Sequence, residues 1–148
     1  MKIIIWIAAI IIVLAIVYFM GPKPEKPVLT RLISEDITSD LVKLEQEINR
    51  SEKAIPNIKK DNEAKIVWAD IDKKEKTQFC VVYIHGFSAS WMEGHPVNMD
   101  FAKRYGCNMY LARLHGHGLE DKEALVGLTP ENYLETAKHA VNIGRQLG

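Results

Sequence analysis

The chain has 148 residues, enough for one ordinary domain, and 47% of them are apolar. Its 19 Lys and Arg residues equal its 19 Asp and Glu residues, so its charge gives no reason to expect a nucleic-acid partner. Cys80 and Cys107 have neither CxxC nor Cys/His ligand spacing; we expect buried free thiols, and the alternative is a disulfide, which would require an oxidising compartment.

The first predicted element is an apolar helix at the N-terminus. Residues 3–20 carry no charged side chain and would span about 27 Å as a helix, close to the hydrocarbon thickness of a bilayer. Trp6 and Tyr18 lie near the two ends, where interfacial aromatic residues are found. We predict an uncleaved transmembrane signal anchor over residues 1–20, with a cleaved signal peptide and a buried core helix as alternatives. The run ends without a small-residue cleavage site, which disfavours the signal peptide.

A proline-rich segment follows this helix. Three prolines within residues 22–27 remove backbone donors and favour an extended chain, so residues 21–35 are predicted to form a linker. Basic residues on both sides of the helix leave a weak positive-inside bias, which points, if anything, to a cytoplasmic C-terminal side. We predict a single-pass membrane protein whose remaining part lies outside the cytoplasm, the common arrangement for a bacterial N-terminal anchor.

Residues 36–148 begin with a helix pattern. Leu41, Leu44 and Ile48 recur at helical spacing after Thr38 or Ser39, either of which can serve as the N-cap. The spacing predicts a helix of about 12 residues.

Two strand patterns come next. Residues 64–69 alternate in part, and residues 79–84 form an apolar run typical of a buried strand. A polar turn at residues 73–76 separates them, and we expect the two strands to form an antiparallel hairpin.

Strands and helices then alternate. His95-Pro96 is expected to start a helix whose apolar stripe consists of Val97, Phe101 and Tyr105. A strand at residues 108–114 is expected to follow.

The last predicted helix starts at Thr129, the N-cap, with Pro130 at its first position. Its predicted core face consists of Leu134, Ala137, Val141 and Gly144. A strand, a crossover helix and a second strand imply a parallel pair, so the predicted fold class is α/β with both sheet faces covered.

Two turns carry the chemical motifs. His85-Gly-Phe-Ser-Ala-Ser90 follows the strand at 79–84, and Arg113-Leu-His-Gly-His-Gly118 ends the strand at 108–114. Together with the order of strands and helices, they resemble the N-terminal half of a serine-type α/β-hydrolase, in the esterase, lipase and serine-aminopeptidase-like branch. The resemblance implies that residues 36–148 form a partial α/β-hydrolase domain, with an antiparallel hairpin followed by parallel strand–helix–strand–helix.

The resemblance also implies roles for the first turn. The backbone N–H of Phe87 would donate to an oxyanion hole, supported by Gly86, which permits the turn, and His85, which braces it. A plain strand-to-helix turn is the alternative. The residues expected at the pocket rim are Ser88, Trp91, His115 and His117. Arg113 is expected to pair with an acid near the strand end.

Ser88 lies in a near match to a nucleophile elbow. Ser90 replaces the second glycine, Phe87 crowds the position, and Ser88 does not directly end a strand. We therefore do not predict Ser88 as the nucleophile. By resemblance, the catalytic Ser, Asp and His would all lie beyond Gly148, so we expect no catalytic residue in this chain and no activity from it alone.

The predicted function is therefore that of a membrane-anchored hydrolase that acts, when complete, on a small ester or acyl substrate. Its partners are the bilayer, through residues 3–20, and a C-terminal half that is either continuous or a separate chain. A non-catalytic, membrane-tethered binding module with an exposed sheet edge is the alternative. A metal protein using His95, His115 and His117 is a third hypothesis, but this spacing does not define a site. We predict no metal and no cofactor.

Overall fold

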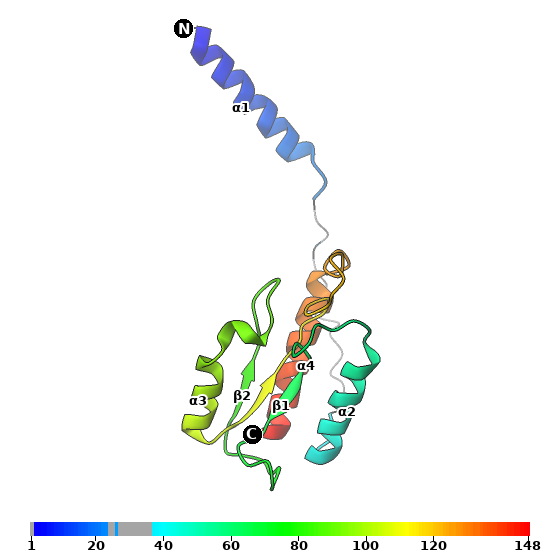
Figure 1. Cartoon of the computed structure of the whole chain (residues 1–148). Helices are drawn as coiled ribbons and strands as arrows, with labels where there is room; N and C mark the ends of the chain where they lie inside the picture. Colours follow the sequence, from blue (N-terminus) through cyan, green and yellow to red (C-terminus); the bar gives the residue numbers. More distant parts are fainter. Residues whose placement is uncertain (1, 24–25, 27–36) are drawn as a thin grey trace.

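The computed structural model describes residues 2–23, 26 and 37–148, which form one long apolar helix and a mixed α/β unit (Figure 1). The elements are α1 (Lys2–Met20), α2 (Leu41–Ala54), β1 (Lys65–Val67), β2 (Cys80–Tyr83), the short 3-10 helix η2 (Trp91–Gly94), α3 (Val97–Tyr105), β3 (Asn108–Leu111) and α4 (Pro130–Leu147). All three predicted strands are present, each shorter than the range predicted for it.

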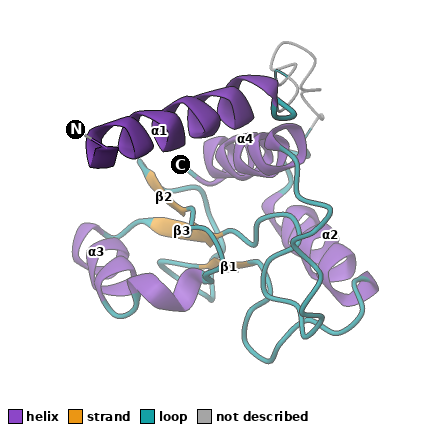
Figure 2. Cartoon of the chain, turned by 90° about the horizontal axis from the view of Figure 1, so that it is seen from above, coloured by secondary structure: helices purple, strands orange, loops and turns teal. Residues whose placement is uncertain are grey.

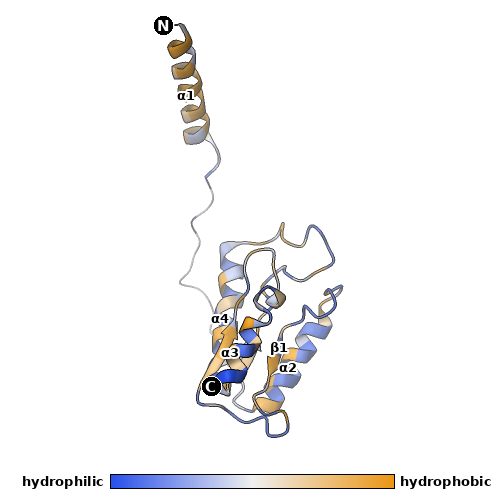
Figure 3. Ribbon diagram, turned by 60° about the vertical axis from the view of Figure 1, so that its left-hand side comes forward, coloured by the Kyte–Doolittle hydropathy of each residue, from blue (hydrophilic) through white to orange (hydrophobic). Residues whose placement is uncertain are grey.

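Helix α1 is long and apolar enough to cross a membrane, and none of Ile3–Met20 is buried. Figures 1 and 3 show it apart from the α/β unit, with apolar residues along its whole length. The absence of burial along this helix does not fit the buried core helix considered above. The linker predicted at residues 21–35 lies mostly outside the described residues.

The sheet has three strands in the order β1-β3-β2. Strands β2 and β3 are parallel, with Cys80 opposite Asn108 and Tyr83 opposite Leu111, whereas β1 runs antiparallel to β3. The predicted hairpin between the first two strands is therefore wrong, because β3 lies between them. Every residue of β3 is buried, while those of β1 and β2 are half-buried. The central strand, β3, is thus the one that is buried on both of its faces.

Helices α2 and α4 cover one face of the sheet, and α3 covers the other (Figure 2). The α2 and α4 face, which we call the closed face, has the larger core. Its buried residues are Leu44, Ile48, Ala64, Trp68, Tyr110, Ala112, Ala140, Ile143 and Leu147. Helix α2 begins after Asp40, whose carboxylate accepts the N–H groups of Val42 and Lys43, so the N-cap is neither Thr38 nor Ser39.

Helix α4 begins as predicted, with Thr129 as the N-cap and Pro130 in the first turn. Its core face differs from the predicted one: Gly144 is buried, but Val141 is 42% exposed. A Cβ at Gly144 would lie 2.2 Å from Val82 Cγ2, so the glycine lets α4 approach β2 closely. The other buried residues of α4 are Ala140, Ile143 and Leu147.

Helix α3 lies over a smaller core on what we call the open face. Its buried residues are Trp91, Ala102, Met109 and Leu111. The predicted stripe is wrong, since Val97, Phe101 and Tyr105 are 73%, 53% and 61% exposed. Asn98 and Ala102 face inwards instead, because the Asn98 amide donates to Trp91 O and the small Ala102 permits close packing.

The two cysteines are free. Cys107 is buried immediately before β3, and Cys80 lies on the edge strand β2. Burial raises the pKa of Cys80 to about 11, so its thiol is protonated at neutral pH.

Candidate functional site

The candidate site lies where the turns after β2 and β3 meet, at the carboxyl edge of the parallel pair. Each turn supplies a histidine that accepts a backbone N–H of the other turn. Leu114 N donates to His85 Nε2 at 3.2 Å, and Ser88 N donates to His117 Nε2 at 3.0 Å. This reciprocal pair of hydrogen bonds fixes the two turns against each other.

Both histidines have their second ring nitrogen engaged as well. His85 Nδ1 donates to Gly86 O at 2.9 Å, and His117 Nδ1 donates to His115 O at 2.7 Å. Both side chains are 2% exposed. Burial lowers the pKa of His85, which keeps its ring neutral, while its contact with Gly86 O opposes this effect. Neither ring has a nitrogen left for proton transfer in this arrangement.

The first turn holds one unused backbone donor. The Gly86 N–H donates to the Glu93 carboxylate, Ser88 N–H to His117, and Ala89 N–H to Gly86 O. The Phe87 N–H has no hydrogen-bond partner among the described residues, and the Phe87 side chain is 70% exposed. Within residues 86–89, Phe87 is thus the position that offers an N–H to a ligand.

Ser88 adopts a left-handed conformation with φ of 59°, a strained value for a residue with a side chain. Its amide, not its hydroxyl, contacts His117. Because that amide uses the Nε2 lone pair, His117 is not placed to act as a base for the Ser88 hydroxyl. The second turn needs its glycine: a Cβ at Gly116 would lie 2.6 Å from Ala124 O, and φ there is 70°.

Glu93 holds the first turn, a role that sequence reasoning missed. Its carboxylate accepts the Gly86 N–H and, at 3.3 Å, the Tyr83 hydroxyl. Burial and the Glu93 charge both raise the pKa of Tyr83, so its hydroxyl remains a donor. One signal was available, since Glu93 is the only acidic residue between Glu75 and Asp100.

Arg113 anchors the second turn to α2. Its guanidinium forms a two-pronged ion pair with Glu52, with Nε–Oε2 at 2.7 Å and Nη2–Oε1 at 3.1 Å. The side chains are only 9% and 10% exposed. Arg113 also donates to His117 O, while Glu52 accepts the Ala64 N–H. The acid that pairs with Arg113 therefore lies on helix α2 and not near the strand end. Its signal in the sequence was its position, because Glu52 lies four residues after Ile48 on the apolar stripe of the helix.

The remaining predicted rim residues are placed differently from one another. Trp91 is buried, and its indole donates to Asp61 O at 2.8 Å, so it belongs to the packing below the turns. His115 is exposed. Among the described residues no three His, Cys, Asp or Glu side chains gather as a metal site, so His95, His115 and His117 do not converge.

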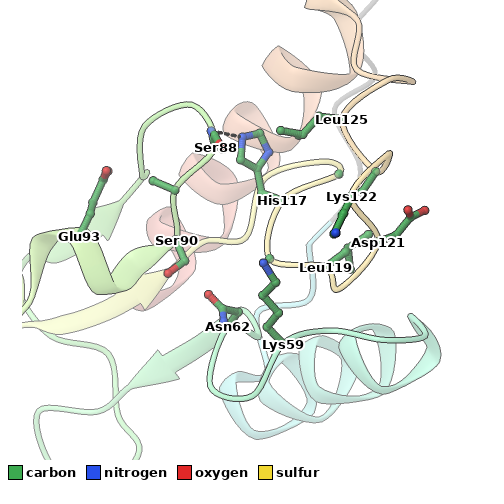
Figure 4. Close-up of a pocket in the computed structure, with 14 residues that line it drawn as sticks. Lys59, Asn62, Ser88, Ser90, Glu93, His117, Leu119, Asp121, Lys122 and Leu125 are labelled. Atoms are coloured by element: carbon green, nitrogen blue, oxygen red, sulfur yellow. Dashed lines mark hydrogen bonds between the residues drawn. The ribbon is translucent and has the colours of Figure 1, made fainter.

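Two cavities flank the first turn. A polar one of about 470 Å³ is lined by Ser88, Ser90 and His117 together with loop residues from both sides (Figure 4). An apolar one of about 380 Å³ is lined by Phe87, Leu128, Thr129, Pro130 and Tyr133. The His117 ring lies between them, 5.9 Å from the rings of both Phe87 and Tyr133.

Comparison with protein-family models, curated proteins and solved structures finds no match to this chain. The class that the described residues define is a mixed α/β unit with a small mixed sheet, preceded by one apolar helix.

Proposed function

We propose that this chain is the membrane-anchored N-terminal portion of an α/β-hydrolase that cleaves a carboxylic ester or similar acyl substrate. One observation carries the proposal: Phe87 N–H has no partner within residues 2–23, 26 and 37–148, while Gly86 N–H and Ser88 N–H on either side are engaged. A rigid backbone donor of this kind is what an oxyanion hole requires, because it is oriented before charge develops.

The surroundings of Phe87 support an acyl substrate. The apolar cavity beside it suits the hydrocarbon part of an acyl group. The reciprocal histidine contacts hold the donor in place, which preserves the hydrogen-bond geometry during the reaction. Glu93 occupies the adjacent Gly86 N–H and so directs an oxyanion to Phe87 alone.

The nucleophile, in this proposal, comes from polypeptide outside residues 1–148, either a continuation or a separate chain. Strand β2 supports this, since it is an edge of the sheet and its flanking residues Phe79 and Ile84 are 66% and 39% exposed. A further strand paired with β2 would cover this edge and extend the parallel sheet. That strand would bring its own turn to the carboxyl edge beside Phe87.

Helix α1 is the proposed membrane anchor. Its length, its composition and its exposed apolar surface suit a single span. In this proposal the α/β unit lies on the extracytoplasmic side.

The first experiment measures hydrolysis of p-nitrophenyl butyrate by the full chain in lipid nanodiscs. We expect no turnover above buffer. Turnover that disappears in Ser88→Ala would overturn the assignment of an external nucleophile.

The second experiment reads the nucleotide sequence after codon 148 and assays its full product. We expect a strand, a Gly-x-Ser-x-Gly turn and later Asp and His codons, with esterase activity in the product. Phe87→Pro removes the N–H and should lower kcat by about 100-fold or more, whereas Phe87→Ala keeps the N–H and most of the activity. Equal losses in the two variants would contradict the oxyanion role.

A second candidate is a non-catalytic module that binds a partner strand along β2, which is favoured by the position of β2 at the edge of the sheet that the described residues form. A genuine stop codon without a downstream frame, together with no esterase activity, would favour this module over the hydrolase.

A further inference from the structure

The polar cavity beside Ser88 is lined by two lysines that take no part in the contacts between the two turns described above. Lys59 enters it from the loop after α2, and Lys122 from the loop after β3. Figure 4 shows their amino groups directed into the space below Ser88 and His117. Two lysine ammonium groups from distant parts of the sequence therefore lie in one cavity.

The loops that carry these lysines are joined to each other. Ile58 and Leu119 form an antiparallel bridge. Lys59 N donates to Gly118 O at 2.8 Å, and Glu120 N donates to Asn57 O at 2.8 Å. The backbone on both sides of the cavity is thus held by hydrogen bonds, so the two ammonium groups extend from a fixed frame.

The acids that line the same cavity are already engaged. Glu93 accepts Gly86 N–H and the Tyr83 hydroxyl. Asp121 accepts Glu123 N–H at 2.9 Å, and its carboxylate points away from the cavity centre in Figure 4. The lining thus includes two acidic residues and two lysines. The lysine amino groups point into the cavity, whereas the two carboxylates already accept hydrogen bonds from the protein.

No ion pair within the described residues includes Lys59 or Lys122. Neutral donors complete the set. The hydroxyl groups of Ser88 and Ser90 line the same cavity, and Ser90 Oγ accepts Met92 N–H at 3.4 Å, which leaves its own hydrogen free to donate. Ammonium and hydroxyl donors around one space are the groups that bind a carboxylate or a phosphate.

We propose that this cavity binds a compact oxyanion, a carboxylate or phosphate, carried by the substrate. The first turn separates it from the apolar cavity, so a substrate with an apolar acyl part and an anionic part would place its carbonyl near Phe87. The substrate role rests on the proposed hydrolase function, whereas oxyanion binding does not.

The test measures binding to the full chain in zwitterionic nanodiscs by NMR titration. Inorganic phosphate and acetate are the probes, tetramethylammonium is the cationic control, and hexyl phosphate reports whether an attached alkyl chain adds affinity. We expect phosphate or acetate to bind and tetramethylammonium not to bind. Lys59→Met and Lys122→Met should each weaken anion binding by about fivefold or more. Lys60→Met is the matched control, because Lys60 adjoins Lys59 but does not line the cavity.

Absence of anion binding, or an equal loss in Lys60→Met, would overturn the site. Tighter binding of hexyl phosphate than of inorganic phosphate, with the gain lost in Leu128→Ser, supports an amphiphilic ligand; equal binding of both overturns the two-cavity assignment. If anion binding depends on the two lysines but the product of the full coding sequence has no esterase activity, the anion site stands and the hydrolase proposal fails. The failure of the anion site can thus be told apart from the failure of the hydrolase function.

Discussion

The two faces of the sheet differ in how completely they are covered. On the closed face, α2 and α4 bury a continuous core in which Ile143 and Leu147 have no exposed surface. On the open face, α3 covers a smaller core and leaves Val97, Phe101 and Tyr105 on its outer side. The rings of Phe101 and Tyr105 lie 4.7 Å apart and mostly in solvent.

This difference shows where the unit obtains its stability. The turns of the candidate site lie at the sheet edge between the two faces, but Arg113 ties them to α2 on the closed face. The closed face therefore supports both the fold and the site, while the open face and the β2 edge retain apolar surface that a further element could bury.

The largest expected effect comes from breaking the connection between the site and the closed face. Arg113→Met leaves the Glu52 carboxylate buried without its cation, so the free energy of unfolding should fall by about 3–5 kcal/mol. Urea unfolding of the full chain in detergent micelles, followed by tryptophan fluorescence, measures it. The double variant Glu52→Met/Arg113→Met should lose clearly less than the sum of the single losses. Additive losses would mean that the ion pair does not couple the two elements.

The next prediction compares the faces directly. Ile143→Ala on the closed face should lower the free energy of unfolding by about 2–5 kcal/mol, because it leaves a cavity in a packed core. Phe101→Ala on the open face should change it by no more than about 0.5 kcal/mol. The same unfolding assay applies to both. Similar losses would show that α3 is buried in solution, for example against a second copy.

The smallest expected effect is a pH dependence of the free energy of unfolding, caused by His85 in the turn after β2. Because the pKa of His85 is lowered in the folded state, the unfolded chain binds a proton that the folded chain excludes as pH falls below 6.5. The stabilisation is complete above that pH and declines below it, by less than about 1.4 kcal/mol per pH unit for one proton. His85→Gln should show a flatter profile between pH 7 and 5. An unchanged slope would place the effect at another histidine.

Local signals predicted a good part of the fold. The Thr129-Pro130 start of α4 was correct, because an N-cap and a first-turn proline act within one helical turn. The strands were located by short apolar or alternating segments, and α1 by the uncharged apolar run at residues 3–20. These features depend on neighbouring residues and can be read without the rest of the chain.

The candidate site was predictable only in outline. The motifs indicated the two turns and singled out Phe87, but not the contacts that engage the N–H groups of its neighbours Gly86 and Ser88. Glu93 and Glu52 were missed as anchors, since their partners lie 7 and 61 residues away. Side-chain contacts over such separations depend on how the elements pack.

By itself, the sequence determined the apolar N-terminal helix, the alternation of strands and helices, and the positions of the two motif turns. Only the tertiary structure decided that β3 separates β1 from β2, that α3 turns its apolar stripe outwards, and that the histidines of the two turns exchange contacts. The physical reason is that local conformation depends on capping and on side-chain periodicity. Strand order and helix orientation depend instead on which surfaces bury one another across the chain.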